Sequence, residues 1–425
     1  MVNGRSVPGN RWDLLDGTEP EPPPTVSVVV VHYEQQAELD RTLAALRRQT
    51  HPAGRTEVIV VDDGSAEPPR VPDGVRLLRQ ADEGFRAAAA RNRGAAAATS
   101  DVLCFLDADT VPEPDYLTRM SRLPALAPEA VVVGRRRHAD LAALPVDAPV
   151  EKAGPEAELP EPQWLRDGYR LSRNLLDADD RSYRYVISAA LACSRWFFER
   201  VGGFDEQFRT YGGEDWEWAY RAWLGGAVLA HEPEAVAWHD GPDWAGRDLE
   251  DPARRARKDN ETLLLTDRIP VAGSRGHGLR SAGTDVLIRL GSAPSPAAAF
   301  VCVDSLLAAL PEAVVRVPAE FGALFAADQR VTTSGPEPLA RVIIDVPEAV
   351  RADRTAKELK EAVATVGVGT LGTVELGPLR IDSSRALARR TTWGRDFFET
   401  NVHTDVDLVP LDADPGLAGY LGGWS

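Results

Sequence analysis

The stretch Val26-Ser-Val-Val-Val-Val31 decides the fold, because it is a nearly unbroken run of β-branched residues. Such a run is typical of a strand that is buried on both faces of a parallel sheet. Leu39, Leu43 and Leu46 follow it at helical spacing, and Val58-Ile-Val-Val61 then repeats the strand pattern. This order of strand, helix and strand predicts the beginning of an α/β sheet.

The next segments continue the alternation. A weaker strand pattern covers 75–78, an Ala/Arg-rich helix is expected over 84–99, and Val102-Leu-Cys-Phe-Leu106 is another buried strand pattern. Strands and helices at this spacing predict an open, doubly wound, Rossmann-like sheet. In such a sheet the functional site lies at the carboxyl ends of the strands.

Two segments lack this pattern. Residues 1–24 are polar and end in Glu19-Pro-Glu-Pro-Pro-Pro24, which predicts a disordered N-terminal segment. Residues 135–184 are rich in proline and acidic residues, and we expect a variable, mobile insertion there. Ordered structure is expected to resume at Tyr185 and to continue to His239.

A domain boundary is expected near residue 270. A charged run, a helix to about Asp267 and the Gly/Ser-rich segment 272–278 together resemble a connector. We therefore predict an α/β domain over 25–270 and a smaller C-terminal α/β domain, of unassigned role, over 280–425. The predicted elements of the second domain are strands at 285–290, 300–303, 314–317 and 342–346 and a helix at 356–363.

Composition limits the classes of function. The chain has 425 residues and a formal net charge of −17, which argues against general binding to nucleic acid or to anionic membranes. No apolar run approaches the roughly 18 residues of a membrane span, and no signal peptide is evident. Three widely spaced cysteines fit a reducing compartment. We expect a cytoplasmic protein, with the inner face of the membrane as the alternative location.

Paired acids follow two of the predicted strands. Asp62 and Asp63 come directly after the second strand, before a Gly-Ser turn. They could accept hydrogen bonds from a nucleotide, or they could form an ordinary Asx turn and helix cap. Asp107 and Asp109 follow the strand that ends at Leu106, and two acids at this spacing can converge on one hard divalent cation. A solvated turn is the alternative.

A third group of acids lies in Tyr211-Gly-Gly-Glu-Asp-Trp-Glu-Trp218. The glycines allow a close approach of the backbone, and the neighbouring carboxylates of Glu214 and Asp215 raise each other's pKa, so that one can serve as a general base. The alternative is an acidic helix N-terminus with its tryptophans in the core. His239 follows about twenty residues later and is, by itself, as compatible with a structural role.

Taken together and in order, these motifs resemble the family 2 glycosyltransferases of GT-A fold. Within that family they resemble the branch that shares a later motif with galactosyltransferases and chondroitin-polymerase-type enzymes. The similarity extends from about Val26 to His239. The motifs that carry it are VVDDGS, GFRAAAARNRG, FLDADT, VGGFDEQF, YGGEDWEWAYR and AWH.

The resemblance implies a role for each matching residue. Asp215 would be the catalytic base, and Glu214 would hold hydroxyls of the donor or acceptor. Asp109 and His239 would bind Mn²⁺ or Mg²⁺. The positions that would contact a nucleotide-sugar donor, with uracil as its base, are Tyr33, Asp62, Asp63, Arg86, Arg91, Asn92 and Asp107.

These roles imply a metal-dependent, inverting transfer of sugar, because retaining relatives with a similar Gly-Gly-Glu segment typically carry Asn where Asp215 stands. The acceptor stays open among a glycan, a lipid-linked saccharide, a peptide and a natural product. Two other functions are weighed: a nucleotide-sugar-binding module without catalysis, and a sugar-phosphate nucleotidyltransferase. The second lacks support, since the expected Gly-rich, basic loop is replaced by His32-Tyr-Glu-Gln-Gln36.

Three features depart from the family or lie outside it. Ser188-Ala-Ala190 replaces a Gly-Gly-Asn-like segment near the donor sugar, and Tyr211 replaces a tryptophan. In the C-terminal domain, the Arg- and aromatic-rich segment 389–398 is interpreted as an aromatic cluster beneath a charged edge. The alternative is a surface for an acceptor, a protein partner or an oligomer contact.

Overall fold

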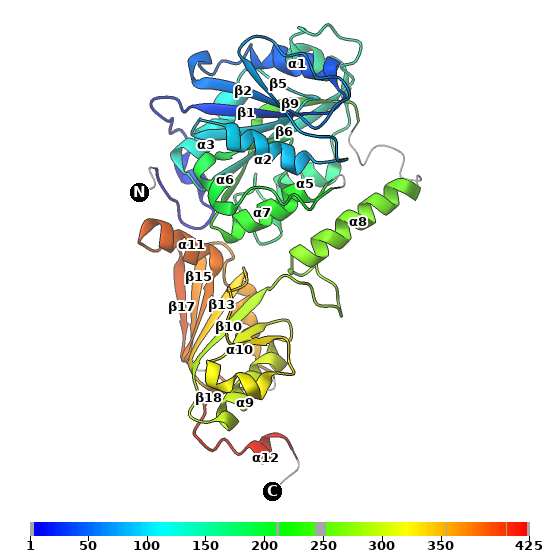
Figure 1. Cartoon of the computed structure of the whole chain (residues 1–425). Coiled ribbons are helices and arrows are strands. Elements are labelled where there is room, and N and C mark those ends of the chain that lie inside the picture. Colours follow the sequence, from blue (N-terminus) through cyan, green and yellow to red (C-terminus); the bar gives the residue numbers. More distant parts are fainter. Residues whose placement is uncertain (1–3, 210–211, 243–251, 354, 405, 423–425) are drawn as a thin grey trace. The chain divides into compact units, whose positions relative to one another are not determined.

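The computed structural model describes residues 4–209, 212–242, 252–353, 355–404 and 406–422 (Figure 1). The chain forms two compact units. The N-terminal unit comprises residues 1–223 and 227–265, and the C-terminal unit comprises 224–226 and 266–425. Each unit has its own sheet, and the motifs singled out above all lie in the N-terminal unit.

The N-terminal unit is built on one mixed sheet, which confirms the predicted α/β class with a GT-A-like sheet. Eight strands follow the order β3-β2-β1-β4-β8-β6-β9-β5, and β7 pairs with β6. The strands are β1 Val26–His32, β2 Thr56–Asp62, β3 Val75–Arg79, β4 Val102–Asp107, β5 Thr110–Pro112, β6 Ala130–Ala139, β7 Glu158–Leu159, β8 Ala190–Ser194 and β9 Val228–Asp240.

The strand order reverses between β1 and β4. The four strands β3, β2, β1 and β4 are parallel, whereas β8 runs antiparallel to both β4 and β6. Strand β2 lies on one side of β1, and β4 lies on the other. In sheets with such a reversal of strand order, ligands bind in the crevice outside the carboxyl ends of the strands. Asp62 and Asp107 are the last residues of β2 and β4.

Helices cover both faces of this sheet. The helices up to residue 268 are α1 Gln36–Leu46, α2 Ala87–Ala97, α3 Tyr116–Leu126, α4 Val150–Glu156, α5 Gln163–Leu171, α6 Arg195–Val201, α7 Glu214–Leu224 and α8 Pro252–Arg268, and not all of them pack against the sheet. Val28 and Val30 of β1 point into a core with α1 and α3. On the other face, Gly94 of α2 meets Val29 and Val61, so closely that a Cβ at Gly94 would lie 2.3 Å from Val29 Cγ1.

The N-terminal segment is ordered over residues 4–24, which corrects the prediction of disorder there. Val7 and Leu15 are buried, and a short 3-10 helix spans Trp12–Leu15. The buried amide of Asn10 donates to the carbonyl oxygens of Leu175 and Leu229 at 2.6 and 2.8 Å. It also accepts from the backbone N–H of Leu229. A polar residue thus satisfies buried backbone groups far away in the sequence, which composition alone does not reveal.

The insertion at 135–184 also differs from the expected loop. Strand β6 continues through its first residues to Ala139, and α4, β7 and α5 follow, with a 3-10 turn at Ser182–Tyr185. Two of the prolines are compatible with these helices, because Pro149 and Pro162 stand just before the first residues of α4 and α5. The segment is therefore built into the sheet and its flank.

The C-terminal unit contains a seven-stranded sheet in the order β12-β11-β10-β13-β16-β15-β17, and a small β14-β18 sheet. Its strands are β10 Val286–Ser292, β11 Val314–Arg316, β12 Val331–Thr332, β13 Val342–Glu348, β14 Val350–Ala352, β15 Leu371–Leu376, β16 Leu379–Ser383, β17 Glu399–His403 and β18 Leu408–Pro410. Its helices are α9 Pro296–Ala309, α10 Lys357–Thr365, α11 Ser384–Trp393 and α12 Leu417–Tyr420. The unit is mixed α/β, as predicted.

One predicted strand of this unit is wrong. Residues 300–303 lie in the middle of α9, not in a strand. The helix begins at Pro296, and the side chain of Ser295 caps it by accepting from the N–H of Ala298 at 3.1 Å. Alanines on both sides of the short apolar run extend the helical segment to fourteen residues, and buried helices cannot be told from buried strands by such a run alone.

Other predictions about the chain can also be compared with the structure. Cys104, Cys193 and Cys302 are all free and buried, as expected of small apolar residues. No helix among the described residues is long and apolar enough to span a bilayer. In the segment 389–398, the half-buried ring of Phe398 lies against the guanidinium groups of Arg385 and Arg389, 5.3 and 5.4 Å from its centroid.

We predict that Gly94→Ala destabilises the N-terminal unit by about 1–3 kcal/mol, because the new methyl group would overlap Val29 and force α2 away from the sheet. Urea unfolding followed by circular dichroism measures the loss. Gly54→Ala is the matched control, since a Cβ there meets no atom within 4 Å. Equal stability of the two variants would contradict the close contact between α2 and the sheet.

Candidate active site

The side chains predicted from sequence gather where β1, β2 and β4 end. Tyr33 directly follows β1, and nearly half of its side chain is exposed. It is therefore available for stacking against a planar ring. Asp63 follows β2, and Asp107 closes β4. The parallel register of the strands sets these residues along one edge.

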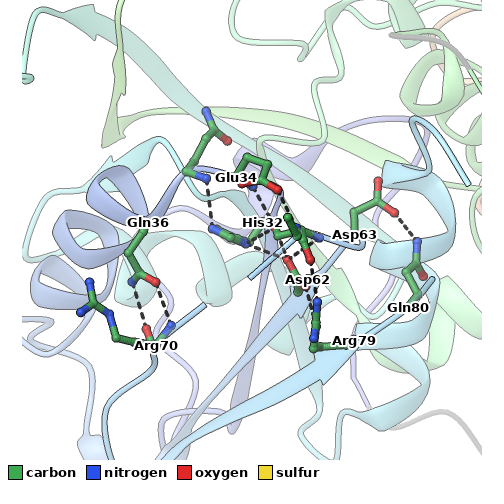
Figure 2. A network of polar contacts seen from close by, with 11 residues as sticks. His32, Glu34, Gln36, Asp62, Asp63, Arg70, Arg79 and Gln80 are labelled. Carbon is green, nitrogen blue, oxygen red and sulfur yellow. Dashed lines mark hydrogen bonds and ion pairs between the residues drawn. The ribbon is translucent and has the colours of Figure 1, made fainter. Parts of the chain in front are cut away.

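Asp62 is fully buried in a network of polar contacts (Figure 2). One carboxylate oxygen accepts from Ser65 Oγ at 2.6 Å and from His32 Nδ1 at 3.0 Å, and the other accepts from Arg79 Nε at 2.8 Å. Burial alone would raise the pKa of Asp62, but these hydrogen bonds outweigh it, and the pKa lies below its usual value. Asp62 is thus tied to the protein, and its predicted contact with a nucleotide finds no support in this geometry.

Asp63 lies beside this network, points toward Gln80 and is buried (Figure 2). Its carboxylate accepts hydrogen bonds from Gln80 Nε2 and, at 2.9 Å, from the backbone N–H of Arg86. Burial raises the pKa of Asp63 in spite of these bonds. Asp63 therefore helps to fix the start of α2, and its charge reaches the neighbouring ring of Tyr33.

Arg91 joins the ends of two motifs. Its Nη2 donates to Asp107 Oδ1 and its Nη1 donates to Glu214 Oε1, both at 2.8 Å. The guanidinium is almost completely buried. Arg91 therefore holds the acid at the end of β4 close to the first residue of α7, although the two acids are more than a hundred positions apart in the sequence.

Asp109 and His239 face each other across the β5–β9 pairing. Asp109 Oδ2 lies 3.5 Å from His239 Nε2 and accepts from Gln35 Nε2 at 3.2 Å. His239 Nδ1 donates to the carbonyl oxygen of Gly241 at 3.2 Å, which leaves the lone pair on Nε2 directed toward Asp109. Burial raises the pKa of Asp109, and the neighbouring charge of Asp107 adds to this effect.

This pair fits a divalent cation that is shared with a ligand. A carboxylate oxygen and a neutral imidazole nitrogen are both ligand atoms for Mn²⁺, and the carbonyl of Gly241 orients the imidazole as an outer-shell partner. Among the described residues, no group of three or more His, Cys, Asp or Glu side chains could hold a metal ion alone. A cation between Asp109 and His239 would therefore take its remaining ligands from diphosphate oxygens and water.

Glu214 supplies a polar atom that the protein leaves unused. Its Oε1 accepts from Arg91, but its buried Oε2 has no hydrogen-bond partner among the described residues. Such an atom is costly to bury and points to a ligand hydroxyl. Gly212, two residues before Glu214, lies close to Glu261. A Cβ at this position would be 2.9 Å from Glu261 Oε2, so the backbone can pass here only as glycine. Tyr211 lies outside the described residues.

Asp215 has the properties of a base near neutral pH. Burial raises its pKa to about 7, and the charge of Glu214 contributes, while Arg91 opposes the shift. The carboxylate accepts from the backbone N–H of Ser188 at 3.2 Å and from its neighbour Trp216 at 2.8 Å. The Ser188-Ala-Ala190 segment, which departs from the family pattern, thus helps to orient this carboxylate.

Two further predicted residues have structural partners. The amide of Asn92 donates to Phe204 O and accepts from Phe204 N, both at 2.9 Å, and it also donates to Glu206. The predicted donor contact is therefore not supported by its geometry, and Asn92 instead holds the loop before α7. The side chain of Arg86 pairs with Glu83 and, at 3.4 Å, with Glu206 at the rim of the site.

Sequence reasoning missed His32, Arg79, Gln80 and Gln35. The first three support the two acids after β2, and Gln35 contacts Asp109. His32 and Gln35 stand at the end of β1 and just beyond it, so the rule that sites lie at carboxyl ends of strands could have indicated them. Nothing local in the sequence indicates Arg79 or Gln80.

Comparison with known proteins agrees with this arrangement. Residues 27–146 match the model of the glycosyl transferase family 2, and residues 176–232 match the model described as the N-terminal domain of galactosyltransferase. Residues 27–146 thus form a segment of the glycosyl transferase family 2 type. The two matched segments lie in the N-terminal unit and contain the acids after β2 and β4 and the start of α7.

Individual proteins are similar to a larger part of the chain. Validoxylamine A glucosyltransferase from Streptomyces hygroscopicus subsp. limoneus is 32% identical over 263 residues, which cover 57% of this chain and 55% of that protein. Hyaluronan synthase from Pasteurella multocida is 28% identical over 269 residues, covering 58% of this chain and 27% of that protein. The chain thus spans about half of the first relative and less of the second.

Among solved structures, the mannosyltransferase PcManGT from Pyrobaculum calidifontis in complex with GDP-Man and Mn²⁺ is similar in fold. The TM-score is 0.38, with 18% sequence identity, and the match covers 64% of this chain and 76% of that one.

We predict that Arg91→Gln lowers the free energy of unfolding by about 3 kcal/mol or more, because it leaves the carboxylates of Asp107 and Glu214 close together without a cation. Urea unfolding measures the change. Arg93→Gln, on the exposed side of the same helix, should stay within about 0.5 kcal/mol of the wild type. If Arg91→Gln were as stable as Arg93→Gln, the bridge would not hold the site together.

Proposed function

We propose that the N-terminal unit transfers a sugar from a nucleotide-sugar donor, a UDP-sugar, to a hydroxyl or other nucleophile of an acceptor. The reaction depends on Mn²⁺ or Mg²⁺ and inverts the anomeric configuration. The observation that carries the proposal is the bridge by Arg91, which sets the acids after β4 and the Asp215 base of α7 around one crevice.

The donor would lie along the strand ends. The exposed ring of Tyr33 can stack on the nucleobase, and Asp63 lies beside it for contacts to the base and ribose. Asp107 would face the ribose or the donor sugar, since within the described residues only one of its oxygens is hydrogen-bonded, to Arg91. The diphosphate then reaches the pair of Asp109 and His239.

A cation bound at that pair would neutralise the charge that develops on the departing nucleoside diphosphate. In the proposed step, Asp215 takes the proton from the acceptor hydroxyl, and the acceptor oxygen forms a bond to the anomeric carbon. The bond from that carbon to the phosphate oxygen breaks, and its electron pair leaves with the diphosphate. The free oxygen of Glu214 holds a hydroxyl of the donor sugar or of the acceptor.

A binding module without catalysis is the other candidate. Such a module would have no need for a carboxylate with a pKa of about 7, fixed by two backbone N–H groups, next to a second buried carboxylate. Perturbed acids of this kind are typical of catalytic sites. This observation favours the enzyme over the module.

The direct test is a screen of sugar nucleotides for hydrolysis with and without Mn²⁺, which identifies the donor without knowledge of the acceptor. At least one UDP-sugar should be hydrolysed only with the metal. Asp109→Ala should lower this hydrolysis about a hundredfold or more, because it removes one of the two protein ligands. Asp73→Ala is the control, because Asp73 is an exposed acid that lies just before the amino end of β3 and not at a carboxyl end. Tight binding of UDP without turnover of any donor would favour the module.

We predict that Asp215→Asn lowers metal-dependent hydrolysis about 10²- to 10⁴-fold while UDP binding is retained, because it removes the base and little else. For the wild type, kcat/KM should rise as the pH approaches about 7 and then level off, since the base acts in its ionised form.

The folded state of the Asp215→Asn variant is checked by its thermal midpoint. A raised pKa means that ionisation of Asp215 costs stability as the pH rises from about 4 toward 7, so the variant should melt no lower than the wild type at pH 8. Asp73→Asn should hydrolyse the donor normally. Near-normal hydrolysis by Asp215→Asn would remove Asp215 from the catalytic role.

A further inference from the structure

A pocket next to the proposed active site is formed by the insertion that sequence analysis could not assign. It has a volume of about 490 Å³, which suits a small-molecule ligand. Strand β6, helix α5, the turn after α5 and strand β9 line it. All of its lining residues belong to the N-terminal unit.

The lining of this pocket is strongly basic. It contains five arginines and one acid, Glu161. Glu161 Oε1 lies 2.7 Å from Arg135 Nη2, and this ion pair neutralises the charge of Arg135. The other four lining arginines are Arg136, Arg166, Arg170 and Arg173.

Two of these arginines also form exposed, weak ion pairs with acids outside the pocket. Arg170 pairs with Asp167 at 3.3 Å, and Arg173 pairs with Asp177 at 2.5 Å. The guanidinium of Arg166 has no hydrogen-bond or ion-pair partner among the described residues, and Arg166 is exposed at the pocket. In a chain with a net charge of −17, a concave site of this sign is a specific local feature.

One buried polar atom in the lining lacks a partner. His231 is 6% exposed, and its Nε2 has no hydrogen bond among the described residues. Its Nδ1 donates to Asn174 Oδ1 at 3.0 Å, and its ring stacks on Tyr169 with the centroids 3.6 Å apart. Burial lowers the pKa of His231 to about 3, so the imidazole is neutral and Nε2 is an acceptor. The Nε2 atom can therefore accept a hydrogen bond from a hydroxyl of a ligand.

The backbone around Asn174 is held in an unfavourable conformation. Arg173, Asn174 and Leu175 have φ values of 51°, 57° and 67°, and three successive non-glycine residues in this region cost roughly 1–2 kcal/mol each. The amide of Asn10, from the ordered N-terminal segment, binds Leu175 O and so helps to fix the turn. Strain that is maintained by the rest of the fold is typical of ligand sites.

The pocket is linked to the proposed base by α5. Trp164 of this helix packs edge-on against Trp216, the neighbour of Asp215, with the ring centroids 6.3 Å apart. Farther along α5, Tyr169 lines the pocket, and its hydroxyl donates to Tyr185 O at 2.7 Å. Burial raises the pKa values of Tyr169 and Asp109. The charge of Asp215 adds to the shift at Tyr169, and the charge of Arg136 opposes the shift at Asp109. The pocket is therefore within electrostatic range of the groups assigned to the reaction.

We propose that this pocket binds an acceptor that carries an anionic group, a carboxylate or a phosphate, next to hydroxyls. Arg166 and Arg170 bind the anion, because guanidinium groups pair with both kinds of oxyanion. His231 Nε2 accepts from a hydroxyl of the same molecule. The assignment of the pocket to the acceptor rests on the proposed transferase function, whereas its selectivity for anions does not.

The test measures binding of three probes to the full chain by calorimetry, without donor. The probes are glucose 6-phosphate, gluconate and glucose, which differ in the anionic group. One or both anionic probes should bind at least tenfold more tightly than glucose, and the preferred one identifies phosphate or carboxylate as the acceptor's group. The variant Arg166→Gln/Arg170→Gln should weaken that binding about tenfold or more. Arg93→Gln, an exposed arginine of α2, should leave it unchanged.

His231→Phe provides a second variant. It keeps the ring stacked on Tyr169 but removes the acceptor atom, so it should weaken binding of the preferred anionic probe, with a thermal midpoint near that of the wild type. Equal binding of glucose and both anions, or unchanged binding in Arg166→Gln/Arg170→Gln, would overturn the proposal. Failure of the wild type to hydrolyse any donor with Mn²⁺ is a separate result, which would overturn the transferase function instead.

Discussion

The buried guanidinium of Arg91 is the interaction on which the rest of the site depends. Asp107 ends a strand of the parallel half of the sheet, and Glu214 begins a helix that follows a long excursion of the chain. Without a cation between them, these acids would repel each other in a place with little water to screen the charge. With Arg91 donating to both, the end of β4 and the start of α7 form one wall of the crevice. The position of Asp215 follows, because it is the next residue of α7.

Features that depend on neighbouring residues could be predicted from the sequence. The β-branched run at Val26 and the acids that directly follow β2 and β4 are local, and the rule that parallel strands end at one edge gathers the acids without knowledge of the tertiary structure. The α/β class of both units and the place of Asp63, Asp107 and Asp109 at the strand ends were accessible for this reason. The strand predicted at 300–303 failed because a short apolar run does not distinguish a buried helix from a strand.

Features that depend on distant partners could not be predicted. Asp62 and Asp63 are equivalent in the sequence, yet His32 and Arg79 bind the first, whereas Gln80 and the backbone N–H of Arg86 bind the second. Asn92 lies in one of the motifs that carry the family resemblance but binds the backbone of Phe204. The N-terminal segment looks disordered by composition, yet Val7 and Leu15 are buried in the core and the amide of Asn10 satisfies backbone groups more than 150 positions away. The basic pocket arises in the same way, from an insertion whose arginines converge only in the fold.

The stereochemistry of the transferred sugar tests the central claim most directly. If Asp215 activates a nucleophile on the face opposite to the departing diphosphate, an α-linked donor gives the β-anomer as the first product. Proton NMR, recorded during metal-dependent hydrolysis before the free sugar mutarotates, distinguishes the two anomers. Initial accumulation of the β-anomer is the predicted result. Initial accumulation of the α-anomer would contradict a single displacement with Asp215 as the base.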